Sequence, residues 1–281
     1  MDGFILVDKE KNITSFSVCN KIKWNLNLNK TGHNGTLDPN ATGLMVVAVN
    51  KATKLMKYIN EHNKEYITTI KFGKISDTLD YDSEVLDGKL NEFDNNDLLN
   101  AINVLKNEEY QLPPMTSAIK INGKKLYEYQ RENKEVVVEK RKIKINDIEL
   151  LSFDKENNEC VIRLNVSKGF YVRSFARDLG LLLKSDAIVK ELRRTKIEDI
   201  DVSNAKKLND ISESDIIPIN KFFDFPKVEV NDYIAKLVKN GVVLDSRQTN
   251  INGIFFVINN CDIIAIYEEV DKNTYKPVII F

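Results

Sequence analysis

Cysteine is scarce in this chain of 281 residues, and the three that occur lie far apart, at Cys19, Cys160 and Cys261. No Cys-x-x-Cys pair is present, which argues against a structural zinc site and against a disulfide framework. Glycine and proline, with 11 and 6 residues, are too few for long disordered tracts. These absences predict a folded protein of a reducing compartment, and we expect the cytoplasm.

Long apolar runs are also missing. The segment from Met1 to Glu10 holds one short apolar run with no basic region before it, so the sequence predicts no signal peptide. No later run approaches the roughly 20 apolar residues that span a bilayer, and no membrane association is expected. Hydrophobic residues still make up 42% of the chain, enough for the core of one large domain and one small domain.

The chain has no excess of either charge, since its net charge at pH 7 is −1. The distribution is uneven, however. Residues 75–112 carry ten Asp or Glu against two Lys, whereas residues 120–144 carry nine Lys or Arg against four Glu, and a second basic cluster spans residues 184–196. A neutral chain with segregated charge can present a basic patch to nucleic acid, although ordinary solvated faces would give the same pattern.

Hydrophobic periodicity predicts an α+β fold built on a mixed, mostly antiparallel sheet. Strands are expected at residues 4–7, 44–49, 65–72, 136–138, 143–153 and 160–166. Helices are expected at residues 15–28, 51–60, 173–184 and 186–194, with a further helix capped by Asp94. A boundary is expected within the aromatic sequence 222–226, which divides the chain into domains of residues 1–224 and 225–281. The second domain is predicted to be β-rich, with a helix at residues 231–239 and strands at 254–258, 263–267 and 278–281.

The most informative segment reads Gly32-His-Asn-Gly-Thr-Leu-Asp-Pro-Asn-Ala-Thr-Gly43. Its glycines and proline shape the backbone, so we expect a rigid loop that holds Asp38 at a set angle between two buried elements. Catalytic side chains are often mounted on such loops. The alternative is an Asx-Pro turn whose carboxylate only accepts hydrogen bonds from nearby backbone N–H groups.

The complete string resembles the signature of the TruB family of tRNA pseudouridine synthases, Gly-His-x-Gly-(Ala/Thr)-Leu-Asp-Pro-x-Ala-Thr-Gly, at every fixed position. The resemblance implies that Asp38 is the catalytic carboxylate. It also implies the pseudouridine synthase fold for the large domain and a PUA-like RNA-binding domain for residues 225–281. Uracil would be detached from its ribose, turned over and rejoined through C5, so no cofactor and no metal are expected.

Two further motifs match the family. Ser167-Lys-Gly-Phe-Tyr-Val-Arg173 fits Lys-Gly-x-Tyr-(Ile/Val)-Arg, which implies that Arg173 pairs with Asp38 and that Tyr171 lines the base pocket. A guanidinium beside a carboxylate is expected to lower the pKa of Asp38. Lys64-Glu-Tyr66 fits Lys-x-Tyr, which implies that the ring of Tyr66 stacks on the flipped uracil with its hydroxyl near C5. In isolation, each motif would more often be packing or a surface ion pair.

Three other positions take their roles from the resemblance. His33 is assigned to RNA binding rather than to acid–base work, and Leu192, ahead of Arg193-Arg194, is assigned to an apolar wall of the pocket. Asp80 matches an aspartate near the unstacked nucleotides, although Asp77, Asp80 and Asp82 could instead form a helix-capping or weak cation-binding loop. The catalytic set is thus Asp38, Tyr66 and Arg173, and the substrate-binding set adds His33, Asp80, Tyr171 and Leu192.

Two segments complete the comparison with the family. Residues 113–144 resemble its mobile insertion, which folds over tRNA, and their basic character fits phosphate contacts. The family's Asp-Lys-Pro-x-Gly-x-Thr-Ser appears here as Asp8-Lys-Glu-Lys-Asn-Ile-Thr-Ser15. This departure, which lacks both Pro and Gly, leaves the geometry of that turn open.

The resemblance as a whole implies an isomerase that converts uridine 55 in the T-arm of tRNA to pseudouridine on an extruded base. Two alternatives remain. The first is a non-catalytic RNA-binding or RNA-folding protein on the same scaffold, and the second is a nucleoside or glycoside hydrolase with Asp38 and Asp80 as its acid–base pair. The short N-terminus and the lack of basic tails favour a stand-alone monomer that needs neither a guide RNA nor a protein partner.

Overall fold

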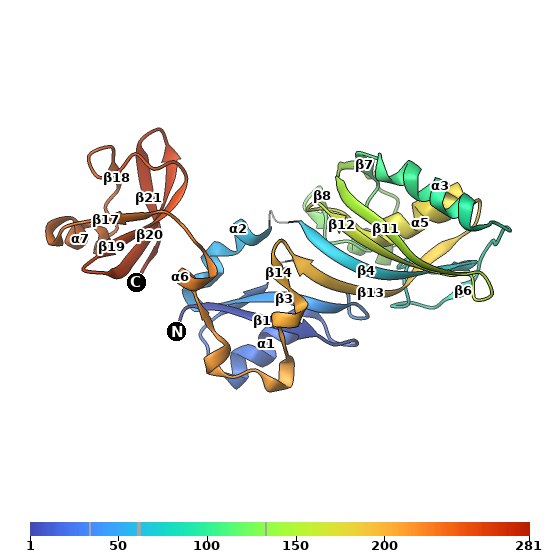
Figure 1. Cartoon of the computed structure of the whole chain (residues 1–281), viewed down its shortest axis with the longest axis horizontal. Coiled ribbons are helices and arrows are strands. Elements are labelled where there is room, and N and C mark those ends of the chain that lie inside the picture. Colours follow the sequence, from blue (N-terminus) through green and yellow to red (C-terminus); the bar gives the residue numbers. More distant parts are fainter. Residues whose placement is uncertain (34, 61–62, 133) are drawn as a thin grey trace.

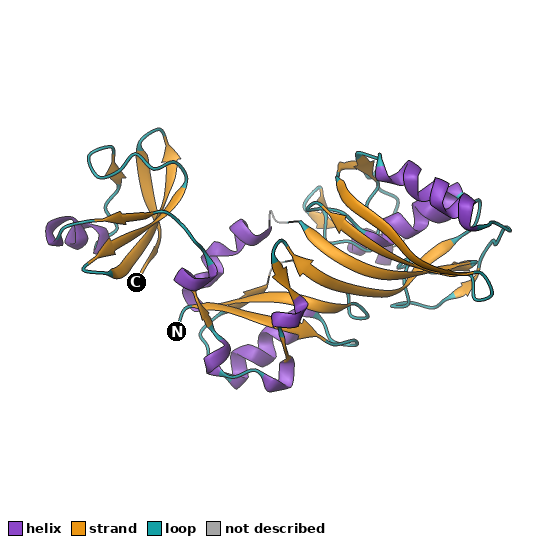
Figure 2. Ribbon diagram, viewed as in Figure 1, coloured by secondary structure: helices purple, strands orange, loops and turns teal. Residues whose placement is uncertain are grey.

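The computed structural model describes residues 1–33, 35–60, 63–132 and 134–281. Figures 1 and 2 show a large part built on a curved sheet and a smaller β-rich part at the C-terminus, with α6 (Ile219–Phe222) near the junction. The expected α+β fold with a mostly antiparallel sheet is confirmed. None of the described helices is long and apolar enough to cross a bilayer.

The main sheet follows the strand order β11-β12-β4-β13-β3-β1-β15, with β2, β14 and β16 paired to β3, β13 and β1. Its strands are β1 (Gly3–Lys9), β2 (Thr31–His33), β3 (Thr42–Val49), β4 (Lys64–Phe72), β11 (Ile145–Asp154), β12 (Glu159–Val166), β13 (Ala187–Ile197), β14 (Ile200–Asp201), β15 (Lys206–Lys207) and β16 (Ile217–Pro218). The pairs β3–β13 and β1–β15 are parallel, and the other pairs are antiparallel.

One face of the sheet is covered by three helices. These are α1 (Ser15–Asn25), α3 (Asn95–Lys106) and α5 (Val172–Leu182). Residues of β1 and β3 alternate between the two faces: Ile5 and Val47 share a core cluster with the three helices, whereas Phe4 and Val46 belong to a different cluster. Two of the helices start at side-chain caps, from Thr14 for α1 and from Asp94 for α3.

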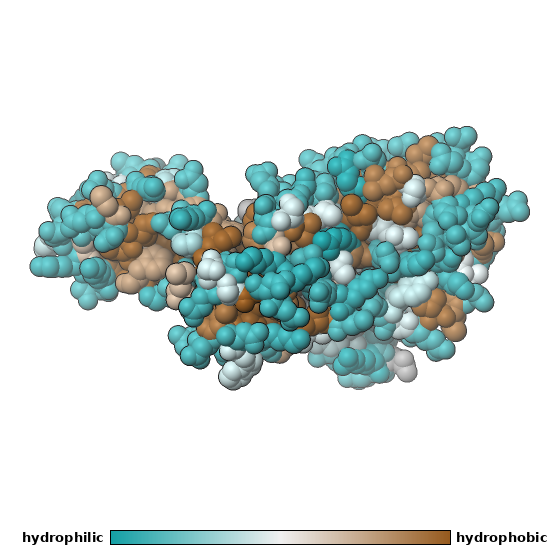
Figure 3. All heavy atoms as spheres, turned by 60° about the horizontal axis from the view of Figure 1, so that its bottom comes forward, coloured by the Kyte–Doolittle hydropathy of each residue, from teal (hydrophilic) through white to brown (hydrophobic). Residues whose placement is uncertain are grey.

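The opposite face joins the two parts of the molecule. Phe4, Leu44 and Val46 share a buried cluster with η1 (Asn50–Leu55) and α2 (Met56–Asn60), and also with Phe256 and Ile266 of the C-terminal part. Figure 3 shows hydrophobic side chains at this junction. The C-terminal sheet has the order β17-β19-β20-β21-β18. Its elements are β17 (Lys227–Glu229), α7 (Asp232–Lys239), β18 (Leu244–Asp245), β19 (Ile254–Asn259), β20 (Asp262–Asp271) and β21 (Thr274–Ile280).

The insertion and the loops carry short elements. They are β5 (Lys74–Ile75), β6 (Leu86–Asp87), β7 (Tyr110–Gln111), β8 (Lys120–Ile121), β9 (Lys124–Lys125), α4 (Leu126–Arg131), β10 (Arg141–Lys142), η2 (Val202–Asn204), η3 (Leu208–Asp210) and η4 (Glu213–Asp215). The insertion leaves the domain between β7 and β10, which pair with each other.

Two of the predicted elements are wrong. Within the segment 186–194, expected as a helix, residues 187–194 lie in β13, which pairs with β4 on one side and β3 on the other. Long-range pairing and the β-branched Ile188 and Val189 outweigh the helical spacing of that segment. Residues 136–138, expected as a strand, have no regular structure, because a run of three valines without a neighbouring strand does not form a sheet.

Candidate active site

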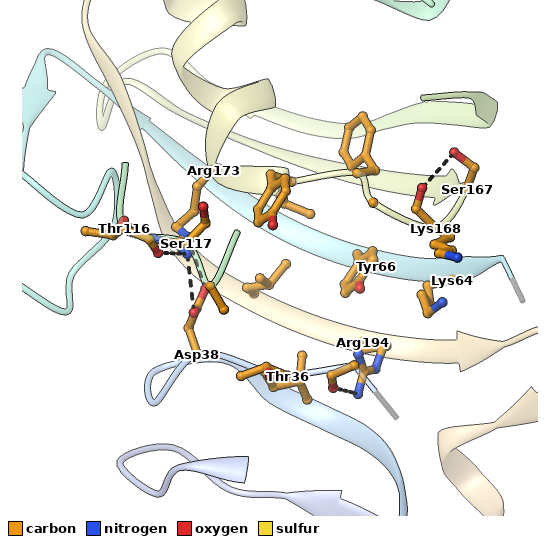
Figure 4. Close-up of a pocket in the computed structure, with 18 of the residues that line it drawn as sticks. Thr36, Asp38, Lys64, Tyr66, Thr116, Ser117, Ser167, Lys168, Arg173 and Arg194 are labelled. Carbon is orange, nitrogen blue, oxygen red and sulfur yellow. Dashed lines mark hydrogen bonds and ion pairs between the residues drawn. The ribbon is translucent and has the colours of Figure 1, made fainter. Parts of the chain in front are cut away.

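A cavity of about 520 Å³ opens where the loop 35–41, strands β4 and β13, the start of α5 and residues 116–118 of the insertion converge. Figure 4 shows this cavity, with Asp38 and Arg173 together at one end and Tyr66, Lys64 and Arg194 farther along it. The structure brings together five residues singled out from the sequence. They are Asp38, Tyr66, Tyr171, Arg173 and Leu192.

The loop that carries Asp38 is held on both sides of that residue. The Ser15 hydroxyl donates to the carbonyl of Leu37 over 3.0 Å and accepts from its N–H over 2.9 Å. Beyond Asp38, the fully buried Lys9 ammonium donates to the carbonyls of Pro39 (3.0 Å) and Ala41 (2.5 Å). Because these bonds fix the backbone at residues 37, 39 and 41, the carboxylate has a defined direction. Asn34 of the motif lies outside the described residues.

The turn that departs from the family motif keeps the backbone shape that a glycine would allow. Asn12 has φ +63°, a left-handed conformation that asparagine tolerates better than most residues. Its N–H donates to the carbonyl of Pro39 over 2.9 Å. The turn therefore supports the Asp38 loop without the glycine and proline of the family pattern.

Arg194 holds the two ends of the loop, at Gly35 and Leu44. Gly43 has φ +104°, and a Cβ there would lie 2.2 Å from the carbonyl oxygen of Arg194, so this contact requires glycine. The close approach lets the buried Arg194 guanidinium donate to the carbonyls of Leu44 (2.7 Å) and Gly35 (3.2 Å). Arg194 also lines the cavity, where it adds positive charge.

Asp38 and Arg173 form a two-point ion pair. Arg173 Nε lies 3.0 Å from Asp38 Oδ2, and Nη2 lies 3.4 Å from Oδ1. The guanidinium side chain is only 8% exposed, and its remaining donors reach the carbonyl of Thr78 (2.9 Å) and both the hydroxyl (2.6 Å) and the carbonyl (3.2 Å) of Thr116. A planar guanidinium with this many fixed partners holds the carboxylate in one orientation.

Asp80 lies behind this pair. Its Oδ2 is 3.6 Å from Arg173 Nε, and its Oδ1 accepts from the Thr78 hydroxyl and from the N–H of Asp82. The side chain is 7% exposed and does not line the cavity. Asp80 is therefore placed to hold Arg173, and this placement argues against a pair of carboxylates that flank a substrate bond as in a hydrolase. No group of three or more His, Cys, Asp or Glu among the described residues could hold a metal ion.

Arg173 lowers the pKa of Asp38, as expected, but burial raises it more, and the charge of Asp80 raises it further, so the net shift is upward. The side chain still keeps 33% of its surface, and it lines the cavity. Burial also raises the pKa of the neighbouring Asp82, to about 6, with contributions from Asp80 and Asp38. Because it has lost part of its solvation, the ionised carboxylate of Asp38 is a stronger base and nucleophile than a fully solvated carboxylate.

The rest of the cavity suits a flat ring and an anion. The buried Tyr66 and the half-buried Tyr171 supply aromatic surface, and Leu192 supplies an apolar one. Burial raises the pKa of Tyr171, so its phenol stays protonated. Basic residues in the lining are Lys57, Lys64, Lys168, Arg173 and Arg194.

His33 is placed apart from these residues. It lies on β2 opposite Val47 and does not line the cavity. Burial lowers the pKa of His33, and the charge of Arg194 lowers it further, so its imidazole is neutral at pH 7.

The sequence did not predict the loop residues that accept hydrogen bonds from Arg173. Thr78 and Thr116 follow no motif that marks them as partners of an arginine, and they lie 95 and 57 residues away from it in the chain. Lys9 lies in the Asp8–Ser15 motif, so the sequence marked it as a residue of interest. Its hydrogen bonds to the Asp38 loop, however, depend on the folded backbone and could not be predicted.

Known proteins are similar to this chain in sequence and in fold. A family model described as TruB family pseudouridylate synthase (N terminal domain) matches residues 23–172. The tRNA pseudouridine synthase B of Onion yellows phytoplasma (strain OY-M) is 38% identical over 284 residues and covers 100% of both chains. That of Aquifex aeolicus (strain VF5) is 35% identical over 274 residues, which cover 95% of this chain and 96% of the relative.

Among solved structures, a chain in the crystal structure of a Cbf5-Nop10-Gar1 complex superimposes with a TM-score of 0.70 at 24% identity. The match covers 96% of this chain and 79% of that one. At this level of identity the likeness concerns the fold.

Proposed function

The chain belongs to the TruB family of pseudouridylate synthases, and from this premise we propose that it isomerises uridine 55 in the T-arm of tRNA to pseudouridine, with Asp38 as the catalytic carboxylate. The observation that carries the assignment of Asp38 is its two-point ion pair with Arg173 at the end of a cavity lined by two tyrosines. Full-length relatives named tRNA pseudouridine synthase B support tRNA as the substrate.

The reaction exchanges one bond for another within the same nucleotide. The N1 glycosidic bond of the uridine breaks, a C5 glycosidic bond forms, the hydrogen at C5 leaves as a proton, and N1 takes up a proton, so that the product is an isomer of the substrate. Asp38 supplies the anion that this exchange requires, beside the ribose or the base. Arg173 keeps the carboxylate oriented, and its charge opposes the cost of enclosing an anion when the substrate covers the cavity.

The uridine has to leave the RNA stack before it can reach Asp38. In the proposed complex Tyr66 stacks on the extruded uracil, which contributes roughly 1–3 kcal/mol, while Tyr171 and Leu192 bound the ring. The lysines of the lining are suited to the phosphates on either side of the nucleotide, and the buried Arg194 adds positive charge behind them. Asp80 acts through Arg173 in this arrangement, and His33 contacts the RNA outside the cavity.

The remaining contacts with tRNA are assigned to two parts of the chain. The basic insertion at residues 113–144 folds over the T-arm, and the PUA-like domain at residues 225–281 binds a more distant part of the molecule. Both parts lie on the same chain as the site, so the enzyme works as a monomer without a guide RNA or a protein partner. Because its substrate is tRNA, we place it in the cytoplasm.

Release of tritium from C5-labelled uridine in a tRNA transcript tests the proposal. Wild-type protein should release label from one uridine per tRNA, and a transcript with cytidine in place of uridine 55 should release none. Asp38→Asn should bind tRNA with unchanged affinity and lose activity by about 10³-fold or more. The matched control is Asp147→Asn, since Asp147 is an exposed aspartate on β11 whose ion pair with Arg163 lies outside the cavity. Activity of Asp38→Asn at the wild-type rate would overturn the assignment.

A further inference from the structure

Gln111 links the insertion at residues 113–144 to α5, the helix that carries Arg173. Gln111 is buried and lies in β7, the strand at the N-terminal base of the insertion, opposite Arg141 of β10 at the other base. Its carboxamide makes two hydrogen bonds with the backbone of a single residue. Gln111 Oε1 accepts from the N–H of Tyr171 over 2.8 Å, and Nε2 donates to the carbonyl of Tyr171 over 3.1 Å. The side chain thus binds Tyr171 as a neighbouring strand would.

Tyr171 is the point at which α5 begins. It is the N-cap residue of that helix, yet its side chain makes no capping bond. Its carbonyl accepts the first helical bond, from the N–H of Phe175, over 3.1 Å. A helix that starts without a Ser, Thr, Asp or Asn cap lacks the side-chain hydrogen bond that stabilises its first turn. Gln111 supplies a constraint from outside the helix, at the residue whose ring borders the cavity and two residues before Arg173.

The stem of the insertion makes further bonds with the same helix. The carbonyl of Leu112, next to Gln111, accepts from the Ser174 hydroxyl over 2.8 Å and from Arg177 Nη2 over 3.0 Å. Farther along the stem, Thr116 accepts from Arg173 through its hydroxyl and its carbonyl. Residues 111–116 and the first turns of α5 are therefore one hydrogen-bonded unit, and Gln111 is the member that holds the backbone of Tyr171 at two points.

We propose that Gln111 is a positioning residue for the isomerisation, which sets the ring of Tyr171 and the guanidinium of Arg173 relative to Asp38. The inference rests on the proposed function, because it assigns a catalytic consequence to this geometry. Gln111 does not line the cavity. Its loss should therefore slow the chemical step and leave the binding of tRNA unchanged.

Gln111→Met tests this, because methionine is close to glutamine in length and volume but can make neither bond. Under single-turnover conditions at saturating tRNA we expect the rate to fall by about 10- to 100-fold, the size of effect that a small misplacement of catalytic groups produces. The Kd for tRNA should stay within about 2-fold of the wild-type value, far below the 10-fold change that corresponds to 1.4 kcal/mol. The matched control is Asn107→Ala, which removes a carboxamide bond to the backbone of Asn103 at the exposed end of α3 and should change neither quantity.

A double-mutant cycle separates positioning from general stability. If Gln111 acts through Arg173, Gln111→Met should reduce the rate much less in an Arg173→Lys background than in the wild type, since the geometry it maintains is already lost. Equal reductions in both backgrounds, or a wild-type rate for Gln111→Met, would overturn the inference. Failure of the proposed function would be visible separately, because the wild-type protein would then form no pseudouridine.

Discussion

Arg173 Nε lies 3.0 Å from Asp38 Oδ2 and Nη2 lies 3.4 Å from Asp38 Oδ1. The other N–H groups of the guanidinium donate hydrogen bonds to two loops. Through Nη1 it reaches the carbonyl of Thr78 and the hydroxyl of Thr116. The orientation of the carboxylate thus depends on three segments that are distant in the sequence. A charge alone at this position would not reproduce that arrangement.

Replacement of Arg173 by lysine keeps the charge and removes the fork of donors. An ammonium group cannot hold both oxygens of Asp38 and also reach Thr78 and Thr116. We expect Arg173→Lys to lower kcat by about 10²-fold or more, the magnitude typical for loss of one oriented electrostatic contact in an active site. The measurement is pseudouridine formation at saturating tRNA. Arg163→Lys is the control, because Arg163 pairs with Glu149 (2.6 Å) on the exposed surface of β11 and β12; a wild-type kcat for Arg173→Lys would refute the orienting role.

The pH dependence of the rate should report the raised pKa of Asp38. In the proposed mechanism the ionised carboxylate is the active form, so activity should be lost as pH falls through its pKa, and burial should move that loss to a higher pH than for an ordinary aspartate. Asp80 raises the pKa of Asp38 through its charge, and Asp80→Asn removes that charge in nearly the same shape. We expect the acid limb of the single-turnover rate to shift to lower pH in Asp80→Asn.

Asp147→Asn serves as the control for this shift, since that exposed carboxylate pairs with Arg163 outside the cavity. The maximal rate of Asp80→Asn should also fall, because Arg173 loses a partner, but the shift of the acid limb is independent of that fall. An acid limb that stays in place, or that moves to higher pH, would show that Asp80 does not influence the ionisation of Asp38.

The resemblance to the TruB family implied that Asp38, Tyr66, Tyr171, Arg173 and Leu192 share a site, and all five line the cavity, whereas His33 and Asp80 do not. The resemblance did not show how these side chains are held there. The bonds from Thr116 and Gln111 to α5 depend on where the insertion leaves the sheet, which no local pattern encodes. The same limit explains the error at residues 186–194, where the pairing of β13 with β3 and β4 decides the conformation. It also explains the direction of the Asp38 pKa, because the loss of solvation depends on all surrounding atoms.

Lys9 should make folding stability rise with pH in the alkaline range. Burial lowers the pKa of Lys9 from 10.5 to about 8, so between these two values the unfolded chain binds more protons than the folded one. Linkage then requires the free energy of unfolding to rise with pH across this window, by up to about 3 kcal/mol for a shift of this size. Urea unfolding of wild-type protein and of Lys9→Met at several alkaline pH values isolates the contribution, because the variant lacks it. Lys11→Met, in an exposed neighbour that pairs with Glu191, should reproduce the wild-type slope, and equal slopes for Lys9→Met and wild type would contradict the prediction.

Phe256 should contribute to the stability of both parts of the molecule. Its ring is 1% exposed and shares a buried cluster with Phe4, Leu44 and Val46 of the main sheet, and it packs 5.3 Å from the ring of Phe225. Truncation of a buried phenylalanine leaves a cavity that typically costs 3–5 kcal/mol, so we expect Phe256→Ala to lower the free energy of unfolding by about that amount. Phe16→Ala, at a ring that is 69% exposed on α1, should cost far less. Because the cluster joins the two parts, urea unfolding of Phe256→Ala followed by far-ultraviolet circular dichroism should remain one transition, shifted to lower urea. Two separate transitions would mean that the two parts unfold independently.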